Sequence, residues 1–265
     1  MIEITSPKNP KIKQIKSLYR RKVRWDMGLF IVEGIKIVEE CIDNNYPLDN
    51  IIYSDELLNT NGGGEIYRKI KSHNNLIYVP NKLFKEISDT ENPQGIMAIA
   101  KITKRSIEEL YKLKNPLVLF LEEVQDPGNM GTIIRTADAF NIDGIIISEG
   151  SVDIYNPKVI RSTMGSIFRM PIYYIENNIE TIEGLKNMGF KIFATSLEGK
   201  DYIYNIDFKN SSLILMGNES KGLSTELNIL ANKRIKIPIL GGAESLNVAI
   251  ASSIIMYEGI KQRMG

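Results

Sequence analysis

Apolar positions in the first hundred residues alternate between helical spacing and short strand-like runs. Between residues 12 and 19 they recur at spacings of three and four, which predicts an amphipathic helix. The same spacing predicts a longer helix over 30–45, and the polar stretch 59–65, with three consecutive glycines, is expected to be a loop. Further segments, strand-like or helical in turn, lie at 50–54, 66–72, 76–80, 82–89 and 95–102. This half of the chain therefore predicts a small α/β domain.

From residue 117 onward the same alternation continues, with longer and more apolar strands. Strands are predicted at 117–124, 144–149, 171–175, 191–196, 213–217 and 235–239. Helices are predicted at 131–140, 157–168, 182–189 and 245–264. Apolar strands separated by helices indicate a mainly parallel sheet that is covered on both faces. The charged stretch 104–115 divides the chain into a domain over 1–103, a linker, and a second domain over 116–265.

Composition excludes several classes of site. The 265 residues include one cysteine, Cys41, and one histidine, His73. An internal disulfide, a CxxC redox pair and a zinc site with several imidazoles are therefore excluded, and we expect no metal. No apolar run reaches about 18 residues, and the N-terminus lacks the apolar core of a secretory signal. We therefore expect a cytoplasmic protein without a membrane association.

Loops that follow parallel strands are where ligands bind in such sheets. The first, 126–135, contains Asn129 near the start of a helix and Arg135 one helical turn after Gly131. A helix N-terminus binds anions, and an arginine adds bidentate phosphate contacts. The structural alternative is that Asn129 only caps the helix and that Arg135 only forms a surface ion pair.

The second and third loops also combine small and polar residues. The second, 217–224, follows a very apolar strand, but it lacks the residue order of a phosphate-binding P-loop and of a GxGxxG dinucleotide motif. It is equally typical of an ordinary strand-to-helix turn, with Ser224 as the helix cap. In the third, 237–251, Glu244 or Ser245 could cap the last helix, whereas Asn247 places an amide in an apolar run, where it needs a partner.

Four segments in this order resemble a known family: DPGNMGTIIRTADAF, RSTMGSIFRMPI, LILMGNESKGLS and IPILGGAESLNVAIASSIIMYE. Together they resemble the SpoU/TrmH family of RNA ribose 2′-O-methyltransferases, within the SPOUT superfamily, over residues 117–262. The segment FIVEGIKIVEECI, with the basic helix before it, resembles the L30e-like substrate-binding domain that often precedes these enzymes.

The resemblance implies a six-stranded α/β fold whose C-terminal segment forms a trefoil knot, and a homodimer whose active site is built across both catalytic domains. It also implies that S-adenosylmethionine binds at the knot. The implied cofactor-binding residues are Thr195, Ser196, Leu215, Met216, Gly217, Asn218, Glu219, Ile237 and Leu246. The implied catalytic residues are Asn129, Arg135, Glu219, Ser245 and Asn247.

Transfer of a methyl group to a ribose 2′-hydroxyl requires that the hydroxyl lose its proton while the reacting atoms are held in line. Relatives implicate the arginine that corresponds to Arg135 in activating the hydroxyl. Because a guanidinium is normally protonated, we expect Arg135 to clamp phosphate or ribose while the other four residues orient the reacting groups.

The resemblance predicts methylation of ribosomal RNA, with large-subunit (23S) RNA as the favoured target, and the separate N-terminal domain favours ribosomal RNA over tRNA. One alternative is a tRNA ribose methyltransferase. Another is a non-catalytic RNA-binding protein of L30e type with a vestigial second domain. A nicotinamide-dependent dehydrogenase is disfavoured, because the GxGxxG motif and its ribose-binding acid are missing.

The net charge of +1 hides a polarised chain. The first 24 residues contain eight Lys or Arg and one Glu, whereas the remainder contains 25 basic and 31 acidic residues. A basic segment of this kind is where an RNA backbone is expected to dock. The RNA-binding candidates are Lys8, Lys11, Lys13, Arg20, Arg21 and Arg24.

Overall fold

The computed structural model describes residues 2–264, which pack as two compact units. The first unit extends to Thr103 and includes a later segment, Asp153–Phe168. The second unit contains Lys104–Val152 and the chain from Arg169 onward. The sequence-based division left 153–168 in the second domain, whereas these residues pack with the first unit.

The first unit is built on a five-stranded mixed sheet. Its strand order is β1 (Ile2–Glu3), β4 (Leu76–Tyr78), β3 (Leu48–Tyr53), β5 (Ile96–Lys101) and β2 (Leu29–Glu33). Strand β5 runs antiparallel to both β3 and β2, while the β1–β4 and β3–β4 pairs are parallel. The strands that the sequence predicts at 50–54, 76–80 and 95–102 are thus confirmed.

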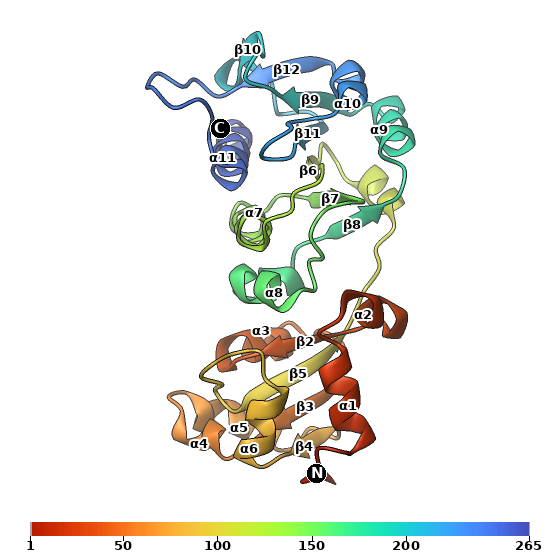
Figure 1. The fold of residues 1–265 in the computed structure, drawn as a ribbon. Helices are drawn as coiled ribbons and strands as arrows, with labels where there is room; N and C mark the ends of the chain where they lie inside the picture. The colour runs from red at the N-terminus through yellow and green to blue at the C-terminus, as the bar shows by residue number, and fades with distance from the viewer. Residues whose placement is uncertain (1, 265) are drawn as a thin grey trace. The chain divides into compact units, whose positions relative to one another are not determined.

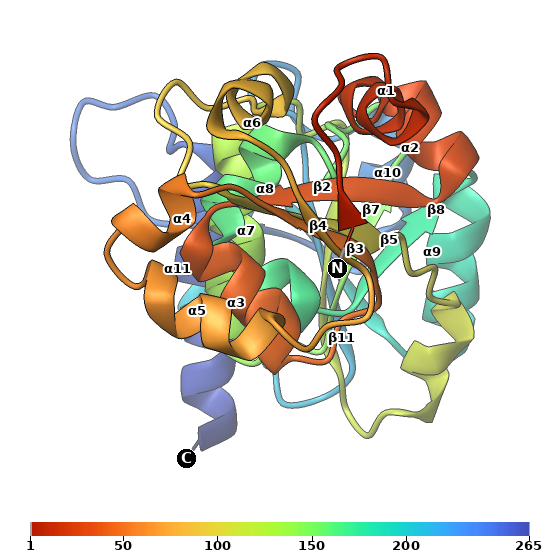
Figure 2. The same cartoon turned by 90° about the horizontal axis from the view of Figure 1, so that it is seen from below.

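Helices cover both faces of this sheet (Figure 2). One face carries α1 (Pro10–Ser17), α2 (Arg21–Met27) and α6 (Asn81–Ile87), and the other carries α3 (Ile35–Asp43), α4 (Glu56–Asn59) and α5 (Gly63–Ile70). The predicted amphipathic helix is α1, whose Ile12 and Ile15 are fully buried against the sheet. The segment from the later part of the chain forms α8 (Pro157–Thr163) and the short η2 (Ser166–Phe168), and α8 packs on β2.

Two predictions for this unit are wrong in part. The segment 30–45 is not one helix, because β2 fills 29–33 and Gly34, with φ of 104°, separates it from α3. The glycine-rich loop is shorter than expected, since α5 already begins at Gly63. A Cβ atom at Gly63 would lie 1.6 Å from the carbonyl oxygen of Leu57, so glycine allows the two short helices to approach.

The second unit contains a seven-stranded sheet in which every pair is parallel. Its order is β10 (Asp201–Tyr202), β12 (Lys233–Lys236), β9 (Lys191–Thr195), β11 (Ser212–Met216), β6 (Leu117–Leu121), β7 (Gly144–Ser148) and β8 (Ile172–Ile175). The predicted parallel sheet is confirmed, and β10 is an additional edge strand that the sequence pattern did not indicate.

Helices cover both faces of this second sheet as well (Figure 1). On one side lie α7 (Pro127–Ala139) and α11 (Val248–Met264), which pack against each other, and on the other lie α9 (Asn178–Asn187) and α10 (Thr225–Leu230). Short 3-10 turns are η1 (Ile107–Lys112) and η3 (Ile203–Asn205). Among residues 2–264, no helix combines the length and the apolar character needed to cross a membrane.

Three boundaries in the later part of the chain differ from the predictions. The predicted helix 157–168 breaks after α8, where Met164 and Gly165 both adopt positive φ. The predicted linker contains η1, which a Ser106–Glu109 capping box starts and whose Leu110 is fully buried in the core of the second unit. The last helix begins at Val248 rather than at 245.

Candidate active site

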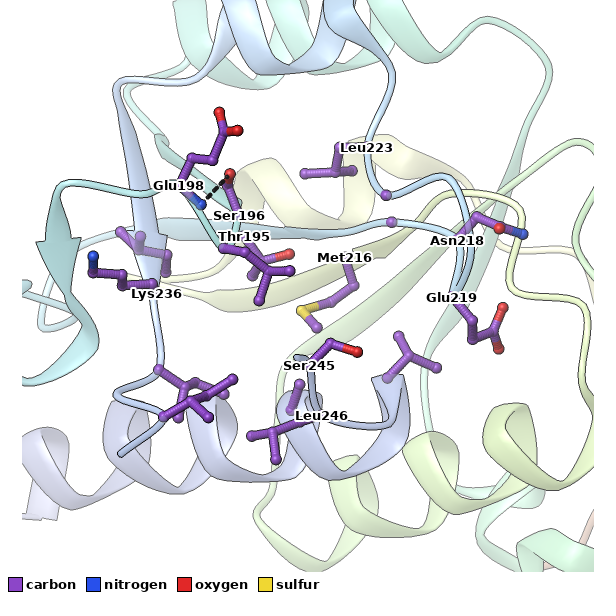
Figure 3. Close-up of a pocket in the computed structure, with 18 of the residues that line it drawn as sticks. Thr195, Ser196, Glu198, Met216, Asn218, Glu219, Leu223, Lys236, Ser245 and Leu246 are labelled. Atoms are coloured by element: carbon purple, nitrogen blue, oxygen red, sulfur yellow. Dashed lines mark hydrogen bonds between the residues drawn. The ribbon is translucent and has the colours of Figure 1, made fainter. Parts of the chain in front are cut away.

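A cavity of about 820 Å³ lies in the second unit, where the carboxyl ends of β9, β11 and β12 meet (Figure 3). Parallel strands direct their C-terminal loops to one edge of the sheet, so loops that are distant in sequence converge there. Three loops line the cavity: the one after β9, the one between β11 and α10, and the one between β12 and α11. Two of the three loops that the sequence singled out thus meet in one cavity.

The loop after β11 folds back on itself. Asn218 and Gly222 exchange two backbone hydrogen bonds, of 3.2 and 2.9 Å, and the Asn218 side chain accepts hydrogen bonds from the amides of Ser220 and Lys221. A Cβ atom at Gly217 would lie 2.3 Å from backbone atoms of Gly222 and its neighbour. Only glycine at 217 therefore allows this closely folded loop.

Asp126, and not Asn129, caps helix α7. The Asp126 carboxylate accepts a 2.7 Å hydrogen bond from the backbone amide of Asn129, and Pro127 occupies the first helical position. The alternative in which Asn129 is merely the cap is therefore wrong. The Asn129 side chain does not cap the helix and can contact other residues of the site.

Three of the five predicted catalytic side chains form a continuous hydrogen-bonded row. The Asn129 amide donates to a Glu219 carboxylate oxygen at 2.9 Å, and the Asn247 amide donates to the Asn129 carbonyl oxygen at 2.9 Å. These residues are 90 and 118 positions apart in the sequence, so the row ties the first loop to the second and third. Because each amide is bonded on both sides, its oxygen and nitrogen positions are fixed.

Asn247 has a second role at the start of α11. Its side-chain oxygen accepts hydrogen bonds from the amides of Ala249, at 2.9 Å, and Ile250, at 3.3 Å. The residue is thus the cap of the last helix, a position that the sequence reading assigned to Glu244 or Ser245. The cap holds the Asn247 side chain in one rotamer, with its amide directed at Asn129.

Most of the predicted cofactor-binding residues line the cavity. They are Thr195, Ser196, Met216, Gly217, Asn218, Glu219, Ile237 and Leu246, and the predicted catalytic Ser245 lines it as well. The exception is Leu215, whose side chain is fully buried in the sheet and whose carbonyl oxygen accepts a hydrogen bond from the Thr195 hydroxyl at 2.9 Å. Leu215 therefore does not line the cavity, but its carbonyl oxygen holds the side chain of the lining residue Thr195.

Several lining residues are not among the site residues predicted from the sequence, namely Glu198, Tyr202, Leu223, Lys236 and Glu244. Tyr202 and Lys236 belong to β10 and β12, which pair in parallel with these two residues in register. The sequence signal was weak because β10 has only two residues. Lys236 lies within the strand predicted at 235–239, but nothing in that pattern marked it as a cavity residue.

The cavity fits S-adenosylmethionine in size and chemistry. Its volume lies within the roughly 300–1,000 Å³ typical of small-molecule sites. Apolar walls suited to an adenine ring come from Leu197, Met216, Leu223, Ile235, Ile237 and Leu246. Carboxylates suited to a cationic ligand are provided by Glu198, Glu219 and Glu244. No cluster of three or more potential metal ligands occurs within residues 2–264.

Of the five predicted catalytic residues, Glu219 and Ser245 line the cavity, and Asn129 and Asn247 connect to it through their hydrogen bonds to Glu219 and to each other. Arg135 has neither relation to the cavity. It lies exposed on α7 and is absent from the cavity lining. The neighbouring Thr136 faces α11, where Ser253 donates a 3.4 Å hydrogen bond to it. A role for Arg135 therefore requires that another molecule, RNA or a second chain, complete the site.

The six basic residues predicted to contact RNA differ in how far their side chains are exposed. Lys8, Lys13, Arg20 and Arg21 are exposed and remain candidates for RNA contact. Lys11 is half-buried and lies 3.0 Å from Asp49. Arg24 is buried against Asp153, so its prediction as an RNA-binding residue is wrong.

Comparisons with known proteins agree with this geometry. The profile of the SpoU rRNA Methylase family matches residues 116–257, and that of the MRM3-like substrate binding domain matches 9–98. The chain is 32% identical to the 23S rRNA (guanosine(2553)-2′-O)-methyltransferase RlmP of Bacillus subtilis (strain 168), over 97% of this chain and 98% of that protein. It is 28% identical to the 23S rRNA (uridine(2479)-2′-O)-methyltransferase of Streptomyces viridochromogenes, over 98% and 92%.

A solved structure is similar over the same length. The AdoMet-bound rRNA methyltransferase from Sinorhizobium meliloti has a TM-score of 0.86 and 32% sequence identity, and the match covers 98% of this chain and 97% of that one. The family profile spans more than half of the chain, and it includes all three loops that meet at the site. The chain belongs to the SpoU rRNA methylase family and carries an N-terminal MRM3-like substrate-binding domain.

Proposed function

We propose that this protein transfers a methyl group from S-adenosylmethionine to a ribose 2′-hydroxyl of large-subunit ribosomal RNA in the cytoplasm. The observation that carries the proposal is the row formed by Glu219, Asn129 and Asn247 at the edge of the cavity. Two relatives that match nearly the whole chain are named as 23S rRNA 2′-O-methyltransferases, which favours ribosomal RNA over the tRNA alternative. An ordered row of this kind argues against a vestigial domain.

The residues of the cavity bind the cofactor and position the ribose hydroxyl. When bound, S-adenosylmethionine supplies an electrophilic methyl group. The Glu219 carboxylate has one oxygen held by Asn129, which leaves the other to accept a hydrogen bond from a ribose hydroxyl. Ser245 adds a hydroxyl from the opposite loop. Together they orient the attacking hydroxyl, and correct orientation alone is worth several orders of magnitude in rate.

The proton of the 2′-hydroxyl must leave without an imidazole. His73, the single histidine, lies in the first unit, where its Nδ1 accepts a hydrogen bond from the amide of Asn75. We assign to Arg135 the binding of the substrate phosphate or ribose, since a guanidinium suits such an anion and remains charged. The proton then passes to an oxygen held near that hydroxyl, on Glu219 or on the RNA phosphate itself.

We propose further that the protein acts as a homodimer whose C-terminal segment forms the trefoil knot of its family. An apolar stripe on α11 supports dimer formation: Ile250, Ile254 and Tyr257 are 51%, 36% and 56% exposed. Their spacing of four and three places them on one face of the helix. A second copy covering this stripe would bring another α7, and with it the second Arg135, close to the cavity.

Methyl transfer tests the proposed function directly. Purified protein is incubated with tritiated S-adenosylmethionine and with ribosomal RNA extracted from cells that lack the gene. We expect tritium in the large-subunit RNA, at a nucleotide whose 2′-O-methyl group is missing in those cells. Incorporation only into tRNA would establish the alternative substrate. S-adenosylmethionine binding without transfer to either RNA would refute the proposal.

A further inference from the structure

Two tyrosines at the edge of the second sheet stack on each other beside the cavity. The rings of Tyr202 and Tyr204 are nearly parallel, with an interplanar angle of 11° and centroids 5.3 Å apart. Tyr202 lines the cavity, whereas Tyr204 follows in η3 and is 56% exposed. The stack therefore begins at the cavity wall and ends in solvent with an uncovered ring.

Basic side chains accompany this stack. The ammonium group of Lys236 lies over the Tyr202 ring, 5.0 Å from its centroid, in the position of a cation–π contact. Figure 3 shows Lys236 at the rim of the cavity, with its amine directed away from Ser245 and Leu246. Because Tyr202 and Lys236 are paired in register and side chains alternate along a strand, Arg234 lies on the same face of the sheet.

The charges on this face are available to a ligand. Lys233, on the opposite face of β12, is paired with Asp201 at 3.4 Å. Arg234 and Lys236 have no ion pair with any carboxylate of the part of the chain that the structure describes, and Arg234 is exposed. An open aromatic ring next to unpaired cations is the combination with which proteins hold unpaired nucleotides: bases stack on the ring, and phosphates lie against the cations.

We propose that Tyr204, backed by Tyr202, is a stacking platform for an unpaired base of the substrate RNA that flanks the methylated nucleotide, and that Arg234 and Lys236 contact its phosphates. The proposal rests on the proposed function, because it takes the Glu219 edge of the cavity as the place where the target ribose is held. A nucleotide whose ribose enters the cavity must be splayed out of its helix, so its neighbours pass over the rim.

Stacking also agrees with the different nucleosides that appear in the names of two relatives. The two relatives that match nearly the whole chain are named for a guanosine and for a uridine, so the shared family residues do not fix the base. Aromatic stacking is tolerant of base identity, because every base has a π-face. The platform would therefore add affinity next to the site without imposing one base.

Equilibrium RNA binding by the full-length protein tests the platform. Filter binding is measured at one fixed salt concentration with ribosomal RNA from cells that lack the gene. Tyr204→Ala and Tyr204→Leu are expected to weaken binding about tenfold, while Tyr204→Phe, which keeps the ring, binds like the unmodified protein. Calorimetric titration with S-adenosylmethionine alone is expected to give the same affinity for all variants.

The chain offers a matched control at the other edge of the same sheet. Tyr174 lies on β8 and is 37% exposed, and Tyr174→Ala is expected to leave RNA binding unchanged. Replacing Arg234 by alanine is expected to reduce the slope of log affinity against log salt by about one, because one phosphate contact is lost.

Three outcomes of these binding measurements would refute the stacking platform, and only one of them would also refute the proposed function. Wild-type RNA binding by Tyr204→Ala, in a protein that does methylate ribosomal RNA, would overturn the platform and leave the proposed function intact. Weakened S-adenosylmethionine binding by Tyr204→Ala would also overturn it, since the ring would then belong to the cofactor site. A wild-type protein that neither binds nor methylates ribosomal RNA would refute the proposed function, and the platform with it.

Discussion

The guanidinium of Arg24 binds Asp153 across 129 residues of sequence. Its Nη2 and Nε atoms lie 2.6 and 3.0 Å from the same carboxylate oxygen, and the two side chains are only 3% and 4% exposed. Arg24 also donates hydrogen bonds to the carbonyl oxygens of Leu18 and Tyr19. The ion pair thus fixes the segment 153–168 to the helices at the N-terminus within the first unit.

Asp153→Asn should destabilise the protein strongly. It leaves the Arg24 charge buried without its counter-ion, which typically costs about 3–5 kcal/mol of unfolding free energy. Urea unfolding followed by circular dichroism measures the loss. Asp49→Asn, which breaks the half-exposed pair with Lys11, serves as the control and should cost less than about 1 kcal/mol. Equal losses for the two variants would contradict this assignment.

The row of Glu219, Asn129 and Asn247 should behave as one unit. We expect Asn129→Ala and Asn247→Ala each to lower the rate of methyl transfer about 100-fold, because each removes the group that positions the next. The double variant should be little slower than either single one, and single-turnover kinetics would measure all three rates.

The control for this series is Asp126→Ser, which replaces one helix cap by another and should retain activity. Independent, multiplicative losses in the double variant would show that the two amides do not act together.

Gly217→Ala should weaken cofactor binding strongly without unfolding the protein. The added methyl group would lie 2.3 Å from the backbone of Gly222, so the loop that lines the cavity must open. We expect the affinity for S-adenosylmethionine to fall more than tenfold, as measured by calorimetry. Gly241→Ala is the matched control, because a Cβ atom there meets no atom within 4 Å. Normal cofactor affinity in Gly217→Ala would rule out this loop as part of the cofactor site.

Two impaired variants should complement each other if the active site is shared between subunits. Arg135→Ala is expected to be inactive and Asn129→Ala to keep about a hundredth of the wild-type rate, and Arg135→Ala should bind S-adenosylmethionine with nearly unchanged affinity. In mixed dimers, a site that takes Arg135 from one chain and Asn129 from the other would be intact once in two. Random association would then restore about a quarter of wild-type activity after coexpression.

Persistent inactivity of the mixture, with mixed dimers demonstrated by two affinity tags, would place both residues in the same chain's site. An additional Ile254→Glu substitution in the apolar stripe should remove any complementation, because it places a charge in the proposed interface.

Cys41 should be unreactive until the protein unfolds. Burial raises the pKa of its thiol from 9.0 to about 12, so almost no thiolate exists in the folded protein at pH 8. A chromogenic disulfide reagent should release one thiol equivalent per chain only after denaturant is added. The raised pKa stabilises the fold at neutral pH, and this contribution is lost between about pH 9 and 12 as the unfolded chain deprotonates. Rapid reaction of the native protein would contradict the burial of Cys41.

Periodicity predicted the parallel sheet, because short, continuous apolar runs such as 117–121 and 213–216 are typical of strands that are buried on both faces. Periodicity did not separate β2 from α3, because the apolar positions of both elements fit one helical spacing. The two elements are separated by Gly34, whose positive φ the pattern does not reveal. Eight of the nine cofactor-binding residues predicted from the family motifs line the cavity, but a motif does not reveal in which direction each side chain points. The motifs could not show that Leu215 faces into the sheet.

Long-range pairing was the other missing information. Nothing near Arg24 in the sequence reveals that its partner is Asp153, so its charge counted toward an RNA-binding surface that it does not reach. The same holds for Asn129, whose two partners come from loops about a hundred residues away. Tyr204 was overlooked because β10, which sets its position, is too short to produce a pattern.

The interrupted path of the chain determines how the protein can be dissected. Because 153–168 belongs to the first unit, the chain passes from one unit to the other at three points, near 103, 152 and 168. A fragment starting at residue 104 would carry Tyr155 and Phe168 without the aromatic neighbours Phe30 and Tyr46. Proteolysis at a single exposed peptide bond should therefore leave the two units held together, and domain exchange between relatives must transplant two separate stretches of sequence.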